Sequence, residues 1–281
     1  MGKIRYHKII RWSNILRLEL KILWKYRESI SHINDVIRLG EKVLSAPSIV
    51  WNENDDFSKI VIIFISQNMH RMQSIKILCK KGFARDSVGL LRVMFENLVD
   101  FKNIHQNKTL IKKYLGYDIY LRLKIARQFE DGNYCADDLL KVEKVIERLE
   151  TQWNEIKSDY TYTDKSSRKR IFTRWTGKNS MQKLSDDVGL GRVYKQIWGL
   201  FSNYSHGSTI VAGSYIMGIE NEKVVMELGT SHEFIENSIF TATANFIDML
   251  SIANEEYNLG LEKDIENMSV KHKKCIASRK D

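Results

Sequence analysis

Proline is almost missing from this sequence, because Pro47 is the only one among 281 residues. Average usage would place about 14 prolines in a chain of this length. Proline removes a backbone donor and clashes with the preceding helical turn, so its scarcity permits long helices. Hydrophobic residues nevertheless make up 43% of the chain. That share is ordinary for a folded protein and argues against general disorder.

Cysteine is also scarce. The three cysteines, Cys79, Cys135 and Cys275, are odd in number, lie far apart and form no CxxC pair. A disulfide framework is therefore excluded, and the pattern fits a reducing compartment.

Long apolar segments are absent. The longest run, residues 60–65, is far too short to cross a bilayer, and residues 1–7 contain no apolar signal region. We therefore expect a soluble cytoplasmic protein with no integral membrane association.

The sequence contains no HExxH, P-loop, GxGxxG or GxSxG motif. Six of its seven histidines are scattered and have no ligand spacing: His7, His32, His70, His105, His232 and His272. The missing motifs argue against a metal site, a nucleotide-binding site and an α/β-hydrolase active site. We therefore expect no metal and no cofactor. His70 is expected either in the core or lining an internal polar pocket.

Apolar residues recur at the three- and four-residue spacing of amphipathic helices. The first such helix should run from Ser13, a plausible N-cap, to Ala46, just before Pro47. Further helices are expected over residues 55–81, 86–104, 110–130, 137–158, 191–204, 234–257 and 263–277. Gly82 should end the helix of residues 55–81, whose apolar middle belongs at the centre of a bundle.

Two short alternating segments within residues 214–228 flank the polar residues 220–222, which predicts a β-hairpin. The fold class is therefore all-α, a multi-helix bundle with one small hairpin. With no repeat or flexible linker, residues 1–281 should form one domain. We divide it into a basic N-terminal helix (1–46), a helical core (55–260) and a polar C-terminal tail (261–281).

The net charge of +9 favours a polyanionic partner, although frequent lysine, isoleucine and asparagine would also follow from an AT-rich genome. Residues 160–180 lack helical periodicity and are expected to form a basic loop. Cations for phosphates and aromatic rings for stacking make this loop a candidate nucleic-acid contact: Lys165, Arg168, Lys169, Arg170, Phe172, Arg174, Trp175 and Lys178. An ordinary charged surface loop is the alternative. The basic N-terminal helix could extend that contact, or dock with its tryptophans on a partner helix or on lipid.

Arg92 and Glu96 lie four residues apart, so their side chains should meet on one helix face among apolar neighbours. A partly buried ion pair that fixes helix packing is one interpretation. An arginine held by Glu96 and directed at a phosphate is the other. Arg85 and Asp86 are expected to face solvent.

His206 follows the helix of residues 191–204 and precedes Gly207, which suits a left-handed helix end. The histidine could cap that end, where its protonated form is favoured. It could equally act as a general acid or base, with Ser202 among the polar neighbours that orient its ring.

Two segments carry a family resemblance. Residues 89–98 resemble the LLRxxxE helix of the bacterial DUF5677 family, and residues 198–206 resemble its YxxxSxxxH segment, with Trp198 in place of the tyrosine. The resemblance spans residues 60–208. It implies a helical protein and singles out Arg92, Glu96, Ser202 and His206 without naming a reaction.

The chain also has a more distant similarity to HEPN domains, helical bundles that often act as metal-independent ribonucleases in toxin–antitoxin and phage-defence systems. Their usual arginine lies four to six residues before the histidine, whereas the nearest one here in the same helix is Arg192. A HEPN-like ribonuclease would need Arg92, held by Glu96, as its cation and His206 as its general base.

Two hypotheses follow for the function. The first is a HEPN-like effector or accessory protein of a bacterial antiphage defence or toxin system that engages RNA or DNA. The second is a non-catalytic helical module that binds a protein partner, a second copy of itself or a nucleoprotein. Enzymatic activity is left open at this point.

Overall fold

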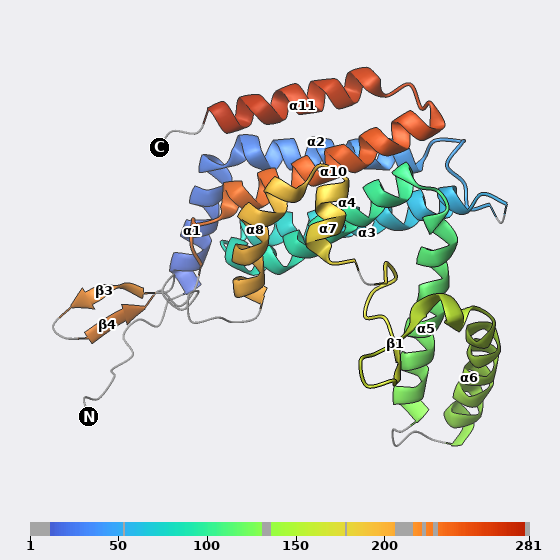
Figure 1. Cartoon of the computed structure of the whole chain (residues 1–281). Helices are drawn as coiled ribbons and strands as arrows, with labels where there is room; N and C mark the ends of the chain where they lie inside the picture. The colour runs from blue at the N-terminus through green and yellow to red at the C-terminus, as the bar shows by residue number, and fades with distance from the viewer. Residues whose placement is uncertain are drawn as a thin grey trace. The chain divides into compact units, whose positions relative to one another are not determined.

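The computed structural model describes residues 12–52, 54–130, 136–177, 179–205, 216–220, 223–226 and 230–278. The chain divides into two compact units, Met1–Lys102 with Leu184–Asp281, and Asn103–Lys183. The all-α fold class is confirmed, since helices dominate both units (Figure 1). A single domain stays a prediction, because division by contacts does not test whether the units fold independently.

The first unit is a bundle around helix α10. Its helices are α1 (Trp12–Lys25), α2 (Arg27–Leu44), α3 (Asp56–Lys80), most of α4 (Val88–Gln106), α8 (Gly191–Ser205), α10 (Ile235–Tyr257) and α11 (Glu262–Ala277). A 3₁₀ turn, η1 (Ala84–Ser87), precedes α4, and α7 (Met181–Asp187) crosses the unit boundary. Helix α10 packs against α2, α3 and α11, which run side by side in Figure 1.

The apolar middle of α3 lies in the core of this bundle, as predicted. Ile60, Val61 and Ile65 are fully buried, and Phe64 stacks on Phe101 with ring centroids 5.2 Å apart. The side chain of Asp55 caps α3 by accepting the Ser58 N–H at 3.0 Å.

Gly82 follows the last residues of α3 and terminates the helix, as predicted. Its φ of +77° is left-handed, and the Phe83 N–H closes the helix end on the Leu78 carbonyl at 2.8 Å. A Cβ at this position would lie 2.8 Å from the Thr230 Cβ, so a larger residue would be crowded as well as strained.

The prediction of one helix over residues 13–46 was wrong, because the helix breaks at Tyr26. Tyr26 has ψ of +21°, which leaves the helical region and separates α1 from α2. The break lets this side chain become buried, with its ring beside His232 at 5.9 Å. The helical spacing of the apolar residues continues unchanged on both sides of Tyr26, so the sequence pattern does not indicate the break.

Arg85 is also a correction, since its side chain is 7% exposed instead of facing solvent. Its Nε donates to Glu233 Oε2 at 3.1 Å, and its Nη2 donates to the same oxygen. The η1 turn changes the direction of the chain just before α4 and places Arg85 inward and Asp86 outward. Glu233 lies 148 residues away, so no local pattern indicated this pair.

His70 is exposed on α3, so both expectations for it, core and internal pocket, were wrong. Gln67 and Ser74, one turn before and after it, are exposed on the same side of the helix, whereas Asn68 is buried.

The second unit pairs α5 (Leu110–Glu130) with α6 (Ala136–Ile156), followed by the 3₁₀ turn η2 (Lys157–Tyr160). An aromatic cluster joins them. Tyr120 contacts Trp153 at 5.2 Å between ring centroids, and Tyr117 and Trp153 both contact Tyr160, at 5.7 and 5.5 Å. Such ring pairs stabilise the packing beyond simple burial.

Each unit carries one antiparallel hairpin. Strands β3 (Ile216–Glu220) and β4 (Lys223–Met226) confirm the hairpin predicted within residues 214–228. In the second unit, β1 (Thr161–Thr163) pairs with β2 (Lys169–Ile171), so part of the expected loop of residues 160–180 is a hairpin. None of the helices in the described part of the chain has the length and apolar character needed to cross a membrane.

Replacing Arg85 by alanine should lower the free energy of unfolding by about 2 kcal/mol, because it removes a charged hydrogen-bonding group from a buried site. Urea denaturation followed by circular dichroism measures the change. Arg148→Ala, at an exposed arginine on α6, is the matched control and should change stability by less than about 0.5 kcal/mol. Equal effects of the two substitutions would contradict a stabilising role for the Arg85–Glu233 pair.

Candidate functional site

The tip of the β1–β2 hairpin has a backbone fixed by Asp164. One carboxylate oxygen accepts the N–H groups of Ser166 and Arg168 at 2.8 and 2.9 Å. The Asp164 N–H donates to the Arg168 carbonyl at 2.8 Å, and Ser167 adopts a left-handed φ of +56°. The hydrogen bond from the Arg168 backbone, followed by that from the Arg170 side chain, lowers the pKa of Asp164. The carboxylate thus stays charged and organises the turn.

Four predicted cations lie exposed on this hairpin: Lys165, Arg168, Lys169 and Arg170. Asp164 contacts Arg170 Nε at 3.1 Å and Arg168 Nε at 3.9 Å. One carboxylate therefore faces four cations, and the tip keeps a positive charge. The guanidiniums of both arginines remain largely open to solvent, which suits contact with a polyanion.

The two predicted aromatic residues of this segment have different surroundings. Phe172 is half-buried and stacks on Tyr162, with centroids 4.8 Å apart and planes 15° apart. Trp175 is 5% exposed and packs edge-on against Tyr114 at 5.4 Å. Trp175 therefore supports the segment from inside instead of offering its ring to a base. Tyr162 is the aromatic partner that the sequence reasoning missed.

The remaining predicted cations of the segment are less informative. Arg174 is half-buried, close enough to Tyr117 for its charge to act on that hydroxyl. Lys178 lies outside the described residues.

Two hydrogen bonds fasten the hairpin to α5 of the same unit, and a third extends the pairing of its strands. The Tyr117 hydroxyl donates to the Phe172 carbonyl at 2.8 Å, and the Tyr160 hydroxyl donates to the Lys113 carbonyl at 2.8 Å. The Phe172 N–H extends the strand pairing to the Tyr160 carbonyl at 2.9 Å. Burial raises the pKa of Tyr160 to about 12, so its hydroxyl keeps the proton that it donates. The cationic tip thus stands on a fixed base.

A second candidate group lies on α4 of the first unit. Arg92 Nε and Glu96 Oε1 are 3.3 Å apart, so the contact expected from their spacing is present. The two side chains are 22% and 25% exposed. This half-buried position leaves both interpretations open, a packing ion pair and an oriented guanidinium.

Ser202 lies half-buried on α8, in the segment that ends at Ser205. His206 follows directly and lies outside the described residues. The structure therefore brings Arg92 to Glu96, places Ser202 on another helix of the same unit, and leaves the role of His206 a prediction.

The sequence reasoning missed a buried pair of histidines. His32 of α2 is fully buried, and its Nε2 lies 3.2 Å from Nδ1 of His272 on α11. The Thr243 hydroxyl of α10 is also 3.2 Å from His272 Nδ1, and Phe240 packs edge-on against that ring. The two histidines are 240 residues apart in the chain, so no spacing pattern could indicate the pair.

Burial is the main reason why the pKa of His32 falls to about 4, with further lowering by His272 and Lys271. The charge of Asp35 opposes this shift. Burial lowers the pKa of His272 as well. Both rings are therefore neutral near pH 7, and the pair joins α2, α10 and α11 as uncharged groups.

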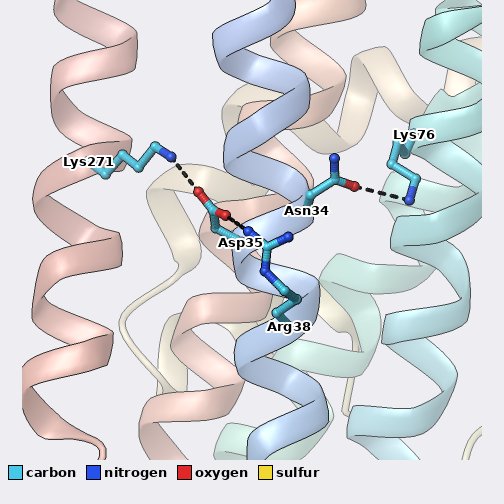
Figure 2. Close-up of polar contacts among 5 residues, drawn as sticks. All are labelled: Asn34, Asp35, Arg38, Lys76 and Lys271. Carbon is cyan, nitrogen blue, oxygen red and sulfur yellow. Dashed lines mark hydrogen bonds and ion pairs between the residues drawn. The ribbon is translucent and has the colours of Figure 1, made fainter.

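Ion pairs beside the histidines attach α11 to the same helix. Lys271 of α11 contacts Asp35 of α2, which also contacts Arg38 (Figure 2). On the other side of α2, Asn34 accepts a hydrogen bond from Lys76 of α3 at 3.1 Å. Helix α2 is thus joined by polar contacts to both α11 and α3. Across the described residues, no group of three or more His, Cys, Asp or Glu side chains is placed to hold a metal ion.

A family model described as "Family of unknown function (DUF5677)" matches residues 58–224, more than half of the chain. The chain belongs to the DUF5677 family. The resemblance inferred from Arg92, Glu96, Ser202 and His206 is thereby confirmed. No curated protein and no solved structure gives a significant match.

The DUF5677 match includes α4, the basic hairpin and α8. It excludes α1, α2, α10 and α11, and with them both histidines of the buried pair. Of the helices that pack against α10, α2 and α11 therefore lie outside the matched region, and α3 lies almost wholly inside it.

Acidification should destabilise the protein through the histidine pair. Because the folded-state pKa of His32, about 4, lies below the usual value of about 6.5, the unfolded chain binds more protons. The contribution is complete above about pH 6.5 and is lost as the pH falls toward 4. We expect the free energy of unfolding to be about 2 kcal/mol lower at about pH 5 than at about pH 7.5.

Urea titrations at the two pH values measure this difference. His32→Gln should be less stable at neutral pH and should show a smaller difference between the two conditions. His70→Gln, at an exposed histidine of α3, should behave like the unaltered protein. An unchanged pH dependence in His32→Gln would contradict the assignment.

Proposed function

We propose that this DUF5677 protein binds nucleic acid through the basic β1–β2 hairpin of its second unit. In the cell it would serve as a HEPN-like effector or accessory protein of a bacterial antiphage defence or toxin system, acting in the cytoplasm. The observation that supports the binding is the exposure of four cations on a hairpin whose backbone is fixed by Asp164 and by α5.

Preorganisation is the physical argument for binding. Cations on a mobile loop lose conformational freedom when they contact phosphates, whereas those on a fixed hairpin lose less. Arginine adds a planar, multidentate donor suited to phosphate oxygens. The stacked Phe172–Tyr162 pair lies at the base of the hairpin and offers an aromatic edge beside the cations. Aromatic and cationic groups together are typical of single-strand contacts.

The competing binding partner is an acidic protein surface, as expected for a non-catalytic scaffold module. Nucleic acid carries a regular array of phosphates with condensed counterions, so its binding should weaken steeply with salt. A protein partner would depend on shape and buried apolar area and would show a shallower dependence. The seven exposed residues of the hairpin are all polar and four of them are cations, which favours the polyanion.

Reversing Arg168, Lys169 and Arg170 to glutamate should weaken binding to single-stranded RNA at least about tenfold, because three phosphate contacts become repulsive. The dependence of the logarithm of affinity on the logarithm of salt should become shallower by about two. Fluorescence anisotropy with labelled RNA and DNA, between about 50 and about 200 mM salt, measures both quantities.

The matched control reverses three exposed cations on the helices of the same unit, Lys124, Lys144 and Arg148. It changes the net charge equally but leaves the hairpin intact. If both triple variants lose the same affinity, the binding follows net charge and the hairpin proposal fails.

A metal-independent ribonuclease is the second candidate, and the Arg92–Glu96 pair supports it. Glu96 orients the guanidinium of Arg92, whose side chain is 22% exposed and could reach a phosphate. In this mechanism His206 takes the proton of a ribose 2′-hydroxyl, and the 2′-oxygen attacks the adjacent phosphorus. Arg92 stabilises the charge on the phosphorane, and the bond from phosphorus to the 5′-oxygen breaks as that oxygen takes a proton from solvent water.

His206→Ala should reduce RNA cleavage in the presence of EDTA at least about a hundredfold, the usual loss when a general base is removed. Arg92→Ala should cause a comparable loss. Glu96→Gln should cause a smaller loss, because the guanidinium of Arg92 remains but is less well oriented. The equivalent DNA strand, which has no 2′-hydroxyl, should stay intact. Cleavage is followed on labelled RNA by gel electrophoresis.

The matched controls are His70→Ala and Arg148→Ala, at exposed residues of the same two types. Both should retain full activity, and circular dichroism should show equal helix content in all variants. Full activity of His206→Ala would overturn the mechanism while leaving the binding proposal intact.

A further inference from the structure

The outward face of α1 carries an unusual pair of exposed apolar side chains. Leu20 is 68% exposed and Trp24 is 78% exposed, one helical turn apart. At 100° per residue, the exposed cations Arg17, Lys21 and Lys25 form a second stripe directly beside them. We call these five residues the α1 face.

The opposite side of α1 is attached to the bundle. Ile22 is fully buried beside Gly82, and Glu19 makes an ion pair with Lys81 of α3 at 2.8 Å. Glu19 is the single acidic residue in the α1 sequence. Its charge is thus neutralised on the inner side, and the α1 face carries positive charge alone.

We propose that the α1 face docks on an anionic lipid surface, with Leu20 and Trp24 entering the headgroup region. A cationic stripe beside an apolar stripe that ends in tryptophan is the arrangement of a helix lying in the plane of a bilayer interface. Tryptophan favours this depth because its ring is amphipathic, and each cation adds attraction to anionic headgroups. With 14 residues, α1 is too short to span the bilayer and lies on it instead.

The cations of the α1 face would also suit binding to nucleic acid, but its two exposed apolar side chains favour lipid as the partner. A leucine gains nothing from phosphate contact, and its transfer out of water is favourable only into an apolar environment. The proposal goes beyond nucleic-acid binding and does not depend on it, because the α1 face and the basic hairpin belong to different units.

The test is co-sedimentation of the full-length protein with phosphatidylcholine vesicles, with and without phosphatidylglycerol. Binding should require the anionic lipid and weaken at high salt. Leu20→Ser with Trp24→Ser should weaken it at least about tenfold, the loss expected when two apolar side chains no longer leave water. Arg17→Glu, Lys21→Glu and Lys25→Glu together should weaken it at least as much.

Two matched controls isolate the α1 face. Val50→Ser with Trp51→Ser removes another exposed aliphatic–tryptophan pair, 51% and 63% exposed, from the segment before α3. The triple reversal of Lys124, Lys144 and Arg148 changes net charge equally. Both control variants should bind the anionic vesicles as the unaltered protein does, and circular dichroism should show that every variant remains folded.

Three results would overturn the proposal. The first is the absence of binding to anionic vesicles, and the second is equal loss in the control variants. The third is a loss of RNA affinity or of a dimer in the α1 variants with vesicle binding unchanged, which would assign the face to nucleic acid or to a second copy. The Arg168, Lys169 and Arg170 reversal should leave vesicle binding intact, so failure here and failure of the hairpin proposal are distinguishable.

Discussion

Helix α10 has buried residues along its length from Ile235 to Asn254. The arrangement of the first unit depends on covering its apolar side chains and on giving its buried polar groups hydrogen-bond partners. Its apolar residues are covered by α2, α3 and α11, but four of its polar residues are buried as well and need partners. Ser238 bonds Ser87 at 2.8 Å, and Thr243 donates to the Ile239 carbonyl at 2.9 Å. Asn254 accepts from the Leu261 N–H and donates to Glu262, both at 2.9 Å. The Ser238 and Asn254 bonds connect α10 to η1 and to the start of α11, whereas the Thr243 bond stays within α10.

Helix α11 shows how polar contacts substitute for apolar burial. Ile265 is its one buried residue among those described, so the hydrophobic effect gives it little reason to dock. Neutral histidines and ion pairs to α2 supply the attachment instead, and Lys42 adds another through Asp264 at 2.9 Å. Such contacts depend on protonation and salt far more than apolar packing does. We therefore expect the attachment of α11 to respond to pH and to salt.

The charged surfaces of the two units are built on different supports. On the hairpin, the Asp164 carboxylate accepts two backbone N–H groups and two backbone–backbone hydrogen bonds close the turn, so the cations are presented by a fixed tip. On α1, an inner ion pair and one buried isoleucine hold the helix, so its cations lie beside apolar side chains. The same excess of lysine and arginine thus presents cations on a fixed hairpin in one place and beside apolar side chains in the other.

The sequence by itself determined most of the helix positions, the 214–228 hairpin and the Arg92–Glu96 contact, because periodicity, glycine placement and i,i+4 spacing are local. It did not determine the break at Tyr26 or the short helix α7. It also determined the family, through two short motifs. Only the tertiary structure decided that Arg85 is buried against Glu233, that His32 meets His272, and that Trp175 packs inside while Tyr162 supports Phe172. These contacts join residues from separate elements, and the free energy that selects them comes from burial, which spacing along one helix does not contain.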